Sequence, residues 1–229
     1  MPGRADRTAA DAPLPPERQG PDFSHEAMLL ARGARVVAGV DEAGRGPLAG
    51  PVVVAAVRLD PAHIPPGLDD SKKLSPARRE ALCAALFATA DIAVATAPPA
   101  EIARLNIRGA TLAAMARAVR ALPVAADRVL VDGRDVPPGL PCPGEALVGG
   151  DGRSVSIAAA SIVAKVMRDR MCRVMADDAP QFGFAGHKGY GTAAHLVALA
   201  SHGPCRHHRR DFAPVAALLL ARTTVVVED

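Results

Sequence analysis

The sequence has very few aromatic residues and no long apolar run. It contains no tryptophan, one tyrosine and five phenylalanines among 229 residues. No stretch approaches the roughly 20 consecutive apolar residues of a membrane-spanning helix, so we expect no contact with a membrane. Its four cysteines stand singly and form no C-x-x-C pair, which argues against a disulfide framework and favours a reduced, cytoplasmic setting. These residues are Cys83, Cys142, Cys172 and Cys205.

A strong excess of charge is also absent. The net charge of +3 is too small to indicate nucleic-acid binding by itself. Hydrophobic residues make up 49% of the chain and charged residues 22%, which is a globular composition. A chain of this length can bury a hydrophobic core without disulfides or a structural metal. We therefore expect a single folded domain, and a monomer.

The first 33 residues differ in composition from the rest. They are rich in proline, alanine and arginine, and they carry Asp6, Asp11 and Glu17 instead of the apolar segment of a signal peptide. We expect residues 1–33 to be a disordered extension, with a short helical lead-in around Ser24–Arg32. Residues 34–229 are then expected to form the folded domain.

The pattern of apolar residues in the remainder predicts an α/β domain. Strands and helices follow one another in a mixed order, which is typical of a mixed central sheet flanked by helices, here with a C-terminal helical extension. The predicted strands are Val36–Val40, Pro51–Val57, Asp91–Ala97 and Arg128–Val131. The predicted helices are Ser75–Ala88, Ala100–Leu105, Ala110–Leu122, Ser156–Met175 and Thr192–His202.

Four carboxylates occupy positions that suggest a common site. Asp41 and Glu42 end the first apolar run and Asp132 ends a later strand, and ligand sites of α/β sheets lie at the carboxyl ends of strands. Asp169 would join them from the long helix. Carboxylates without histidine or cysteine companions favour Mg²⁺ or Mn²⁺ over zinc. The alternatives are turn chemistry at Asp132 and a surface ion pair at Asp169.

The glycine-rich segment after Glu42 is the second candidate feature. Its spacing is G-x-G-x-x-x-G, which does not match a dinucleotide-binding loop, and the next segment is predicted as strand instead of helix. A hairpin turn would also use glycines. However, Arg45 between Gly44 and Gly46 leaves backbone amides open to a ligand, and such a turn beside clustered acids suits a phosphate-bearing substrate.

At this point the sequence resembles a known family, ribonuclease HII, the bacterial type 2 ribonuclease H. The likeness runs in order from about residue 36 to residue 215, and several matching segments in the same order make coincidence unreasonable. The segments are Val40–Val53, Asp70–Ser75, Val131–Gly133, Ile157–Asp169 and Gly186–Thr192.

The resemblance implies a ribonuclease H-like fold and a role in DNA replication and repair. The implied activity is Mg²⁺- or Mn²⁺-dependent hydrolysis of RNA in RNA–DNA hybrids, with incision at ribonucleotides embedded in duplex DNA. It also implies the residue roles. Asp41, Glu42 and Asp132 match the metal ligands and Asp169 the fourth active-site carboxylate, while Gly44, Arg45 and Gly46 match the element that senses the ribose 2′-hydroxyl and Tyr190 the junction-contacting tyrosine.

Physical chemistry is compatible with the substrate roles. The 2′-hydroxyl marks RNA, and glycines let backbone groups reach it. Tyr190, the only tyrosine, lies between glycines and could contact a sugar or base, with ordinary packing as the alternative. Lys72 and Lys73 are candidates for phosphate contacts, although loop lysines are commonly just solvated. The basic segment 206–210 suggests a track for the nucleic-acid backbone, and a zinc site there lacks well-spaced ligands.

Two positions depart from the family pattern, and two other functions stay open. Gly109 replaces a common glutamine, which affects local helix stability, and Asp211 replaces a serine after the paired arginines, which affects the grip of the basic segment. The alternatives are another nuclease of the same fold, such as a junction resolvase or strand transferase, and a hybrid-binding module without activity. The glycine–arginine turn argues against the first and the four acids against the second.

Overall fold

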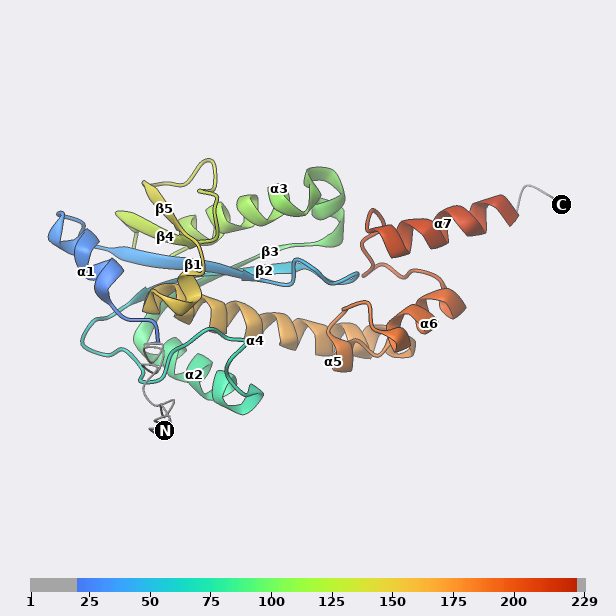
Figure 1. Ribbon diagram of the computed structural model, residues 1–229, viewed down its shortest axis with the longest axis horizontal. Helices are drawn as coiled ribbons and strands as arrows, with labels where there is room; N and C mark the ends of the chain where they lie inside the picture. The colour runs from blue at the N-terminus through green and yellow to red at the C-terminus, as the bar shows by residue number, and fades with distance from the viewer. Residues whose placement is uncertain (1–19, 226–229) are drawn as a thin grey trace, which may run out of the picture.

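A five-stranded mixed sheet forms the centre of the protein. The computed structural model describes residues 20–225, with side chains up to residue 221. The sheet has the order β3-β2-β1-β4-β5, in which β1 pairs antiparallel with β2 and parallel with β4 (Figure 1). The mixed sheet predicted from the sequence is therefore confirmed. The strands are β1 Val37–Ala43, β2 Val52–Leu59, β3 Ala90–Ala97, β4 Arg128–Asp132 and β5 Gly144–Leu147.

Helices cover both faces of this sheet. In Figure 1, α3 lies on one face, α2 and α4 lie on the other, and α7 projects away from the sheet beyond α6. The described helices are α1 Ser24–Ala31, α2 Pro76–Thr89, α3 Pro99–Arg120, α4 Val155–Asp178, α5 Phe184–His187, α6 Ala193–His202 and α7 Ala213–Val225, with the 3-10 turns η1 Gly150–Gly152 and η2 Pro180–Phe182. None of the described helices is long and apolar enough to cross a bilayer.

Alternation along the strands builds two core layers. Because neighbouring residues of a strand point to opposite faces, Val52 and Val54 of β2 pack into the layer under α3. Ala55 and Val57 pack into the layer under α2 and α4. The central strands β1 and β2 are buried on both faces, which explains their nearly continuous apolar sequence.

One strand and one helix differ from the elements predicted from the sequence. β5 was not predicted, because Gly144–Leu147 is a short edge strand with two exposed residues and no β-branched side chain. The two helical segments predicted before residue 122 form one helix, α3, with a break at Asn106. Its backbone there has a positive φ of 56°, and its side chain accepts a hydrogen bond from the Gly109 amide at 3.0 Å, which restarts the helix.

The packed part of the chain begins before residue 34. The predicted lead-in helix is present as α1, where Leu29 is buried against β1 and β4. The buried Glu26 carboxylate accepts hydrogen bonds from the Ser154 hydroxyl and the Ser156 amide. An anion at the beginning of α4 complements the helix dipole. The expectation of a disordered extension falls mainly on residues 1–19, which lie outside the described residues.

A glycine in β1 sets the position of α4. A Cβ added to Gly39 would lie 2.2 Å from the carbonyl carbon of Ser156, so no other residue allows this approach. The beginning of α4 therefore lies directly against the backbone of β1. This contact also holds η1, which precedes α4, near the carboxyl ends of β1 and β4.

Candidate active site

The parallel pairing of β1 and β4 brings two acids side by side. The register pairs Val40 with Val131, and Asp41 and Asp132 are the next residues of the two strands. Parallel neighbours end at the same edge of a sheet, so both carboxyls lie at the carboxyl edge, as the sequence predicted. Asp41 is almost fully buried, and its carboxylate accepts a hydrogen bond from the Glu42 amide at 2.6 Å.

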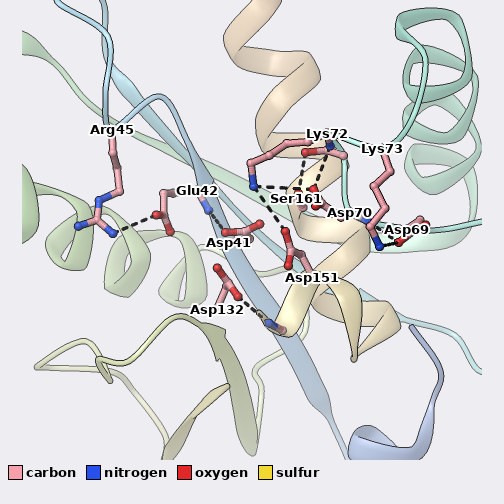
Figure 2. A network of polar contacts seen from close by, with 12 residues as sticks. Asp41, Glu42, Arg45, Asp69, Asp70, Lys72, Lys73, Asp132, Asp151 and Ser161 are labelled. Carbon is pink, nitrogen blue, oxygen red and sulfur yellow. Dashed lines mark hydrogen bonds and ion pairs between the residues drawn. The ribbon is translucent and has the colours of Figure 1, made fainter. Parts of the chain in front are cut away.

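Asp132 positions a third acid that the sequence analysis missed. Its carboxylate accepts a hydrogen bond from the Gly150 amide at 2.7 Å, which fixes the turn η1. The next residue is Asp151, which is buried and points toward Asp41 and Asp132 (Figure 2). The available signal was an aspartate between glycines just before the Ser154 helix cap. It was overlooked because β5 was not recognised, so Asp151 was not seen to follow a strand.

A cavity of about 280 Å³ opens in front of these acids. Asp41, Glu42 and Asp132 line it together, so the structure brings three of the four predicted carboxylates to one place. Glu42 forms an ion pair with Arg45 at 3.3 Å between Oε1 and Nη1. The rest of the lining is Ala43, Gly44, Arg45, Gly46, Ser71, Lys72, Ser161, Lys165, Arg168 and Tyr190.

The fourth predicted carboxylate, Asp169, does not line this cavity. It pairs with Lys165 at 2.6 Å and lies in a neighbouring groove with Arg79 and Arg173. The reason is the helical repeat: Ser161, Lys165 and Arg168 form one stripe of α4 that faces the cavity, and each residue is rotated by about 100° from the one before it. Asp169 therefore points away from the acids, and its assignment to the acid cluster is corrected.

Burial raises the pKa values of Asp41, Glu42 and Asp151, and neighbouring carboxylates add to the effect. Burial, followed by the charges of Glu42, Asp132 and Asp151, raises the pKa of Asp41 well above its usual value. Burial also raises the pKa of Glu42, against the opposing effect of Arg45. The pKa of Asp151 is raised by burial and by the charges of Asp70 and Asp132. The cluster therefore gains from any cation that enters it.

Lys72 and Lys73 differ in their position. The Lys72 ammonium lies 3.6 Å from the Asp151 carboxylate and 3.7 Å from that of Asp70, and it lines the cavity. Burial lowers the pKa of Lys72, but the surrounding carboxylates outweigh this effect and raise it. Lys73 instead pairs with Asp69 at 2.9 Å and does not line the cavity.

The glycine turn and Tyr190 form one wall of the cavity. The amide of Leu48 donates to the Gly189 carbonyl at 2.8 Å, which ties the turn to the segment that carries Tyr190. A Cβ added to Gly46 would lie 3.8 Å from the Tyr190 ring, so the two face the same space. The Tyr190 side chain is half exposed and is available for contact with a ligand.

The donor set fits a hard divalent cation. All the clustered acids offer oxygen atoms, and burial together with the neighbouring carboxylates raises the pKa values of Asp41 and Asp151. Within residues 20–221, no three histidine, cysteine, aspartate or glutamate side chains are already arranged to hold one ion. Mg²⁺ commonly binds through one or two carboxylates, with water and substrate phosphate completing its shell, so a preformed cage is not required.

Comparison with known proteins identifies the family. The family model described as ribonuclease HII matches residues 38–215. The chain belongs to the ribonuclease HII family. A ribonuclease HII of Xanthobacter autotrophicus is 60% identical over 196 residues, which is 86% of this chain and 78% of that protein. A ribonuclease HII of Rhizobium etli is 54% identical over 91% of this chain and 92% of that protein.

Solved structures of ribonuclease HII-type proteins share the fold. The ribonuclease H2 of Pyrococcus horikoshii has a TM-score of 0.69 at 28% identity, covering 81% of this chain and 98% of that chain. The ribonuclease HII in a complex with PCNA from Archaeoglobus fulgidus has a TM-score of 0.67, covering 77% of this chain and 95% of that chain. The chain therefore has the ribonuclease H-like α/β fold, and it belongs to a family of divalent-metal-dependent endonucleases, which are hydrolases that act on RNA–DNA hybrids.

Proposed function

We propose that this protein hydrolyses the RNA strand of RNA–DNA hybrids and also incises at single ribonucleotides embedded in duplex DNA. The observation that carries the proposal is one cavity with two kinds of wall. Its floor carries Asp41, Glu42 and Asp132, with Asp151 close enough for its charge to act on Asp41, and its side is the Gly44–Gly46 turn with Tyr190. The acidic floor suits a phosphodiester with its cations, and the side wall of glycines and tyrosine suits a ribose.

The acids would hold Mg²⁺ or Mn²⁺. We assign this role to Asp41, Glu42 and Asp132, with Asp151 as the fourth carboxylate in place of Asp169, because Asp151 is the acid whose charge acts on Asp41. A pair of such ions supplies water activation and neutralisation of the leaving oxygen in phosphodiester hydrolysis. The protein's contribution is to keep four carboxyls at the edge of a rigid sheet.

The other lining residues would bind and orient the nucleic acid. Lys72 lies beside the acids and can contact the scissile phosphate or its neighbour. The turn at Gly44, Arg45 and Gly46 offers backbone groups to the ribose 2′-hydroxyl, the group that distinguishes RNA from DNA. The Tyr190 ring can lie against the adjoining sugar or base. For Lys73, which pairs with Asp69, we propose only a contact at the margin of the duplex.

The setting of the activity follows from the same considerations. We propose that the protein acts as a monomer in the cytoplasm, in the removal of ribonucleotides during DNA replication and repair. A junction resolvase or strand transferase of the same fold would have no use for a turn that reads a 2′-hydroxyl. A hybrid-binding module without activity would have no use for four convergent acids, whose repulsion costs stability.

The test is a nicking assay with three duplexes of the same sequence. One is all DNA, one carries a single ribonucleotide, and one is an RNA–DNA hybrid. With Mg²⁺ or Mn²⁺ the protein should cut the second and third and leave the first intact, and chelation should abolish cutting. Equal cutting of the all-DNA duplex would refute the proposed specificity. Cutting of the hybrid alone would refute incision at single ribonucleotides.

A further inference from the structure

Two buried arginines lie behind the glycine turn and have no role in the chemistry described so far. Arg168 of α4 and Arg209, in the segment after α6, are 1% and 0% exposed. Each donates three hydrogen bonds from its guanidinium, and all six acceptors are backbone carbonyl oxygens. Among the described residues neither forms an ion pair with a carboxylate. Burying a charge in this way is costly unless the arrangement serves a purpose.

Arg209 holds both ends of the glycine turn. Its Nη2 donates to the Gly44 carbonyl at 2.6 Å, its Nη1 to the Arg45 carbonyl at 2.7 Å, and its Nε to the Gly50 carbonyl at 2.9 Å. A guanidinium is planar and presents these donors in a fixed geometry. Three carbonyls bound to one rigid group cannot rotate independently, so the turn is fixed as a unit.

Fixing these carbonyls also fixes the direction of two amides. In a trans peptide plane the carbonyl of one residue and the N–H of the next point in opposite directions. The Gly44 and Arg45 carbonyls point inward to Arg209, so the N–H groups of Arg45 and Gly46 point outward. Within residues 20–221 neither of these N–H groups donates a hydrogen bond to the protein. Two oriented donors are therefore left for a ligand at the cavity wall.

Arg168 connects the same turn to the segment of Tyr190. Its Nη2 donates to the Lys188 carbonyl at 3.0 Å, and its other bonds reach the carbonyls of Ala49 and Pro51. It also lies directly beneath Gly44, where an added Cβ would be 1.8 Å from its Nε. The turn and the tyrosine segment thus rest on one buried side chain.

The two arginines also place positive charge behind the cavity wall. Burial and the nearby Arg168 lower the pKa of Arg209 to about 10, so it stays charged at neutral pH. No described carboxylate neutralises the pair directly. Their field therefore favours an anion on the other side of the turn, where a phosphodiester backbone would lie.

We propose that Arg209, supported by Arg168, is a positioning residue for ribose recognition: it turns the amides of Arg45 and Gly46 toward the 2′-hydroxyl of the substrate. The inference rests on the proposed function and adds the device that orients the reading turn. A purely structural role would affect stability and all substrates alike, whereas a positioning role affects the reading of the ribose selectively.

The test is Arg209→Lys in the full-length protein, with Arg104→Lys as the matched control. Lysine keeps the charge but cannot bind three carbonyls at once, and Arg104 is an exposed arginine of α3 outside the cavity lining and outside the basic segment 206–210. Two quantities are measured: kcat/KM for incision at a single ribonucleotide, and the Kd for a fluorescent all-DNA duplex in the presence of chelator. Circular dichroism melting reports whether each variant is folded.

We expect Arg209→Lys to lower kcat/KM at the ribonucleotide by at least about tenfold while the Kd for the all-DNA duplex stays within about twofold. Arg104→Lys should leave kcat/KM within the same twofold range. A folded Arg209→Lys with wild-type kcat/KM, or an equal loss in both measurements, would overturn the inference. If Arg209→Lys does not fold, Arg168→Lys must show the same selective loss, and its absence overturns the inference.

The outcome separates this inference from the proposed function. If the wild type itself cuts an all-DNA duplex as fast as a ribonucleotide-containing one, the proposed function fails and no variant is needed to decide it. If the wild type discriminates and the folded Arg209 variant discriminates equally well, only the positioning role fails.

Discussion

Gly44 and Gly46 stand two residues apart, but the fold needs a glycine at only one of them. Gly44 has a positive φ of +95°, and a Cβ there would meet Arg168 at 1.8 Å. Gly46 has an ordinary φ, and the nearest atom to an added Cβ is 3.8 Å away, on Tyr190. Packing thus explains the glycine at position 44, whereas the open space at Gly46 leaves room for the ligand that we propose.

The pair Gly44→Ala and Gly46→Ala separates these two requirements. We expect Gly44→Ala to lower the free energy of unfolding by about 1–3 kcal/mol, because of backbone strain and overlap with Arg168. Gly46→Ala should change it by no more than about 0.5 kcal/mol. It should nevertheless slow incision at a ribonucleotide by about tenfold or more, since the new methyl group occupies the space of the ribose. Wild-type incision by Gly46→Ala would contradict this account.

Asp41 carries an electrostatic cost in the metal-free protein. Its pKa is raised in the folded state by burial and by the neighbouring acids, so the folded chain holds a proton that the unfolded chain has lost. Stability therefore falls as pH rises from the unfolded pKa of about 4 through the raised folded value. Above that window the full cost is present. Divalent cations bound at the site would remove this electrostatic cost.

Asp41→Asn should consequently raise the melting temperature of the metal-free protein at pH 8, while incision is lost. The gain should largely disappear near pH 4, where the folded wild type carries the proton and the unfolded chain carries it about half of the time. Thermal melts in chelator at the two pH values measure this. The exposed Asp177 provides the control, since Asp177→Asn removes a charge at the surface, outside the acid cluster of the cavity. A lower melting temperature for Asp41→Asn at pH 8 would be inconsistent with repulsion at the site.

At the scale of elements, a pair of buried histidines fastens α6 to the segment after it. His195 Nδ1 lies 2.9 Å from the Tyr190 carbonyl and must donate to it, so His195 Nε2 accepts from His208 Nε2 at 3.1 Å. His208 Nδ1 then accepts from the Cys205 amide at 3.0 Å. Every ring nitrogen is used with both rings neutral. An added proton would place N–H against N–H.

This arrangement predicts a loss of stability in mild acid. The pKa of His208 is lowered to about 4. Burial is the largest cause, followed by the effect of His195 and the smaller effects of His207 and His187, and a hydrogen bond from Cys205 opposes them. The unfolded chain takes up the proton first as pH falls below about 6.5. The contribution of His208 to stability is thus complete above pH 6.5 and is lost progressively toward pH 4.

The measurement is the free energy of unfolding in urea of wild type and of His208→Gln, each at pH 8 and at pH 5. The difference between the two proteins at one pH cancels the contributions of the acids, because both proteins contain the same acids. The wild-type advantage should shrink by about 2 kcal/mol between the two pH values. His63→Gln serves as the control, because His63 is an exposed imidazole. A wild-type advantage of the same size at both pH values would exclude the neutral histidine pair.

The elements that the sequence predicted well are those whose residues carry their own signal. β1 and β2 are buried on both faces and read as apolar runs, and Ser75 caps α2 as its position suggested, accepting from the Arg78 amide. β5 carries no such signal, because a short edge strand needs little apolar surface. Asp151 was missed together with β5, since its role depends on which strand precedes it.

The assignment of Asp169 failed for a related reason. Spacing along α4 places Ser161, Lys165 and Arg168 on one face, but the sequence does not say which face meets the sheet edge. The close contact of α4 with Gly39 and the packing of α4 against the sheet and α2 decide the rotation of the helix. Similarly, Arg168 and Arg209 look like surface charges in the sequence, and their burial against backbone carbonyls follows from tertiary structure alone.

At the scale of the whole molecule, the charge pattern of the site is local. The chain has a net charge of only +3, yet Lys72, Lys165 and Arg168 surround the acid cluster at the sheet edge. In the function that we propose, the acids would attract cations and the basic residues around them would attract the phosphodiester of the substrate. Overall composition could not reveal this concentration of both charges in one cavity.

In the function that we propose, cleavage of the substrate depends on four carboxyls at the carboxyl edge of the sheet, and Asp151 is the fourth of them. The most direct test is metal-dependent incision at a single ribonucleotide by Asp151→Asn and Asp169→Asn, two variants with the same chemical change. We expect Asp151→Asn to lose at least about a hundredfold in kcat. Asp169→Asn, which removes an ion pair with Lys165 outside the cavity, should keep its rate within about threefold of wild type. A large loss in Asp169→Asn with normal cutting by Asp151→Asn would contradict the account.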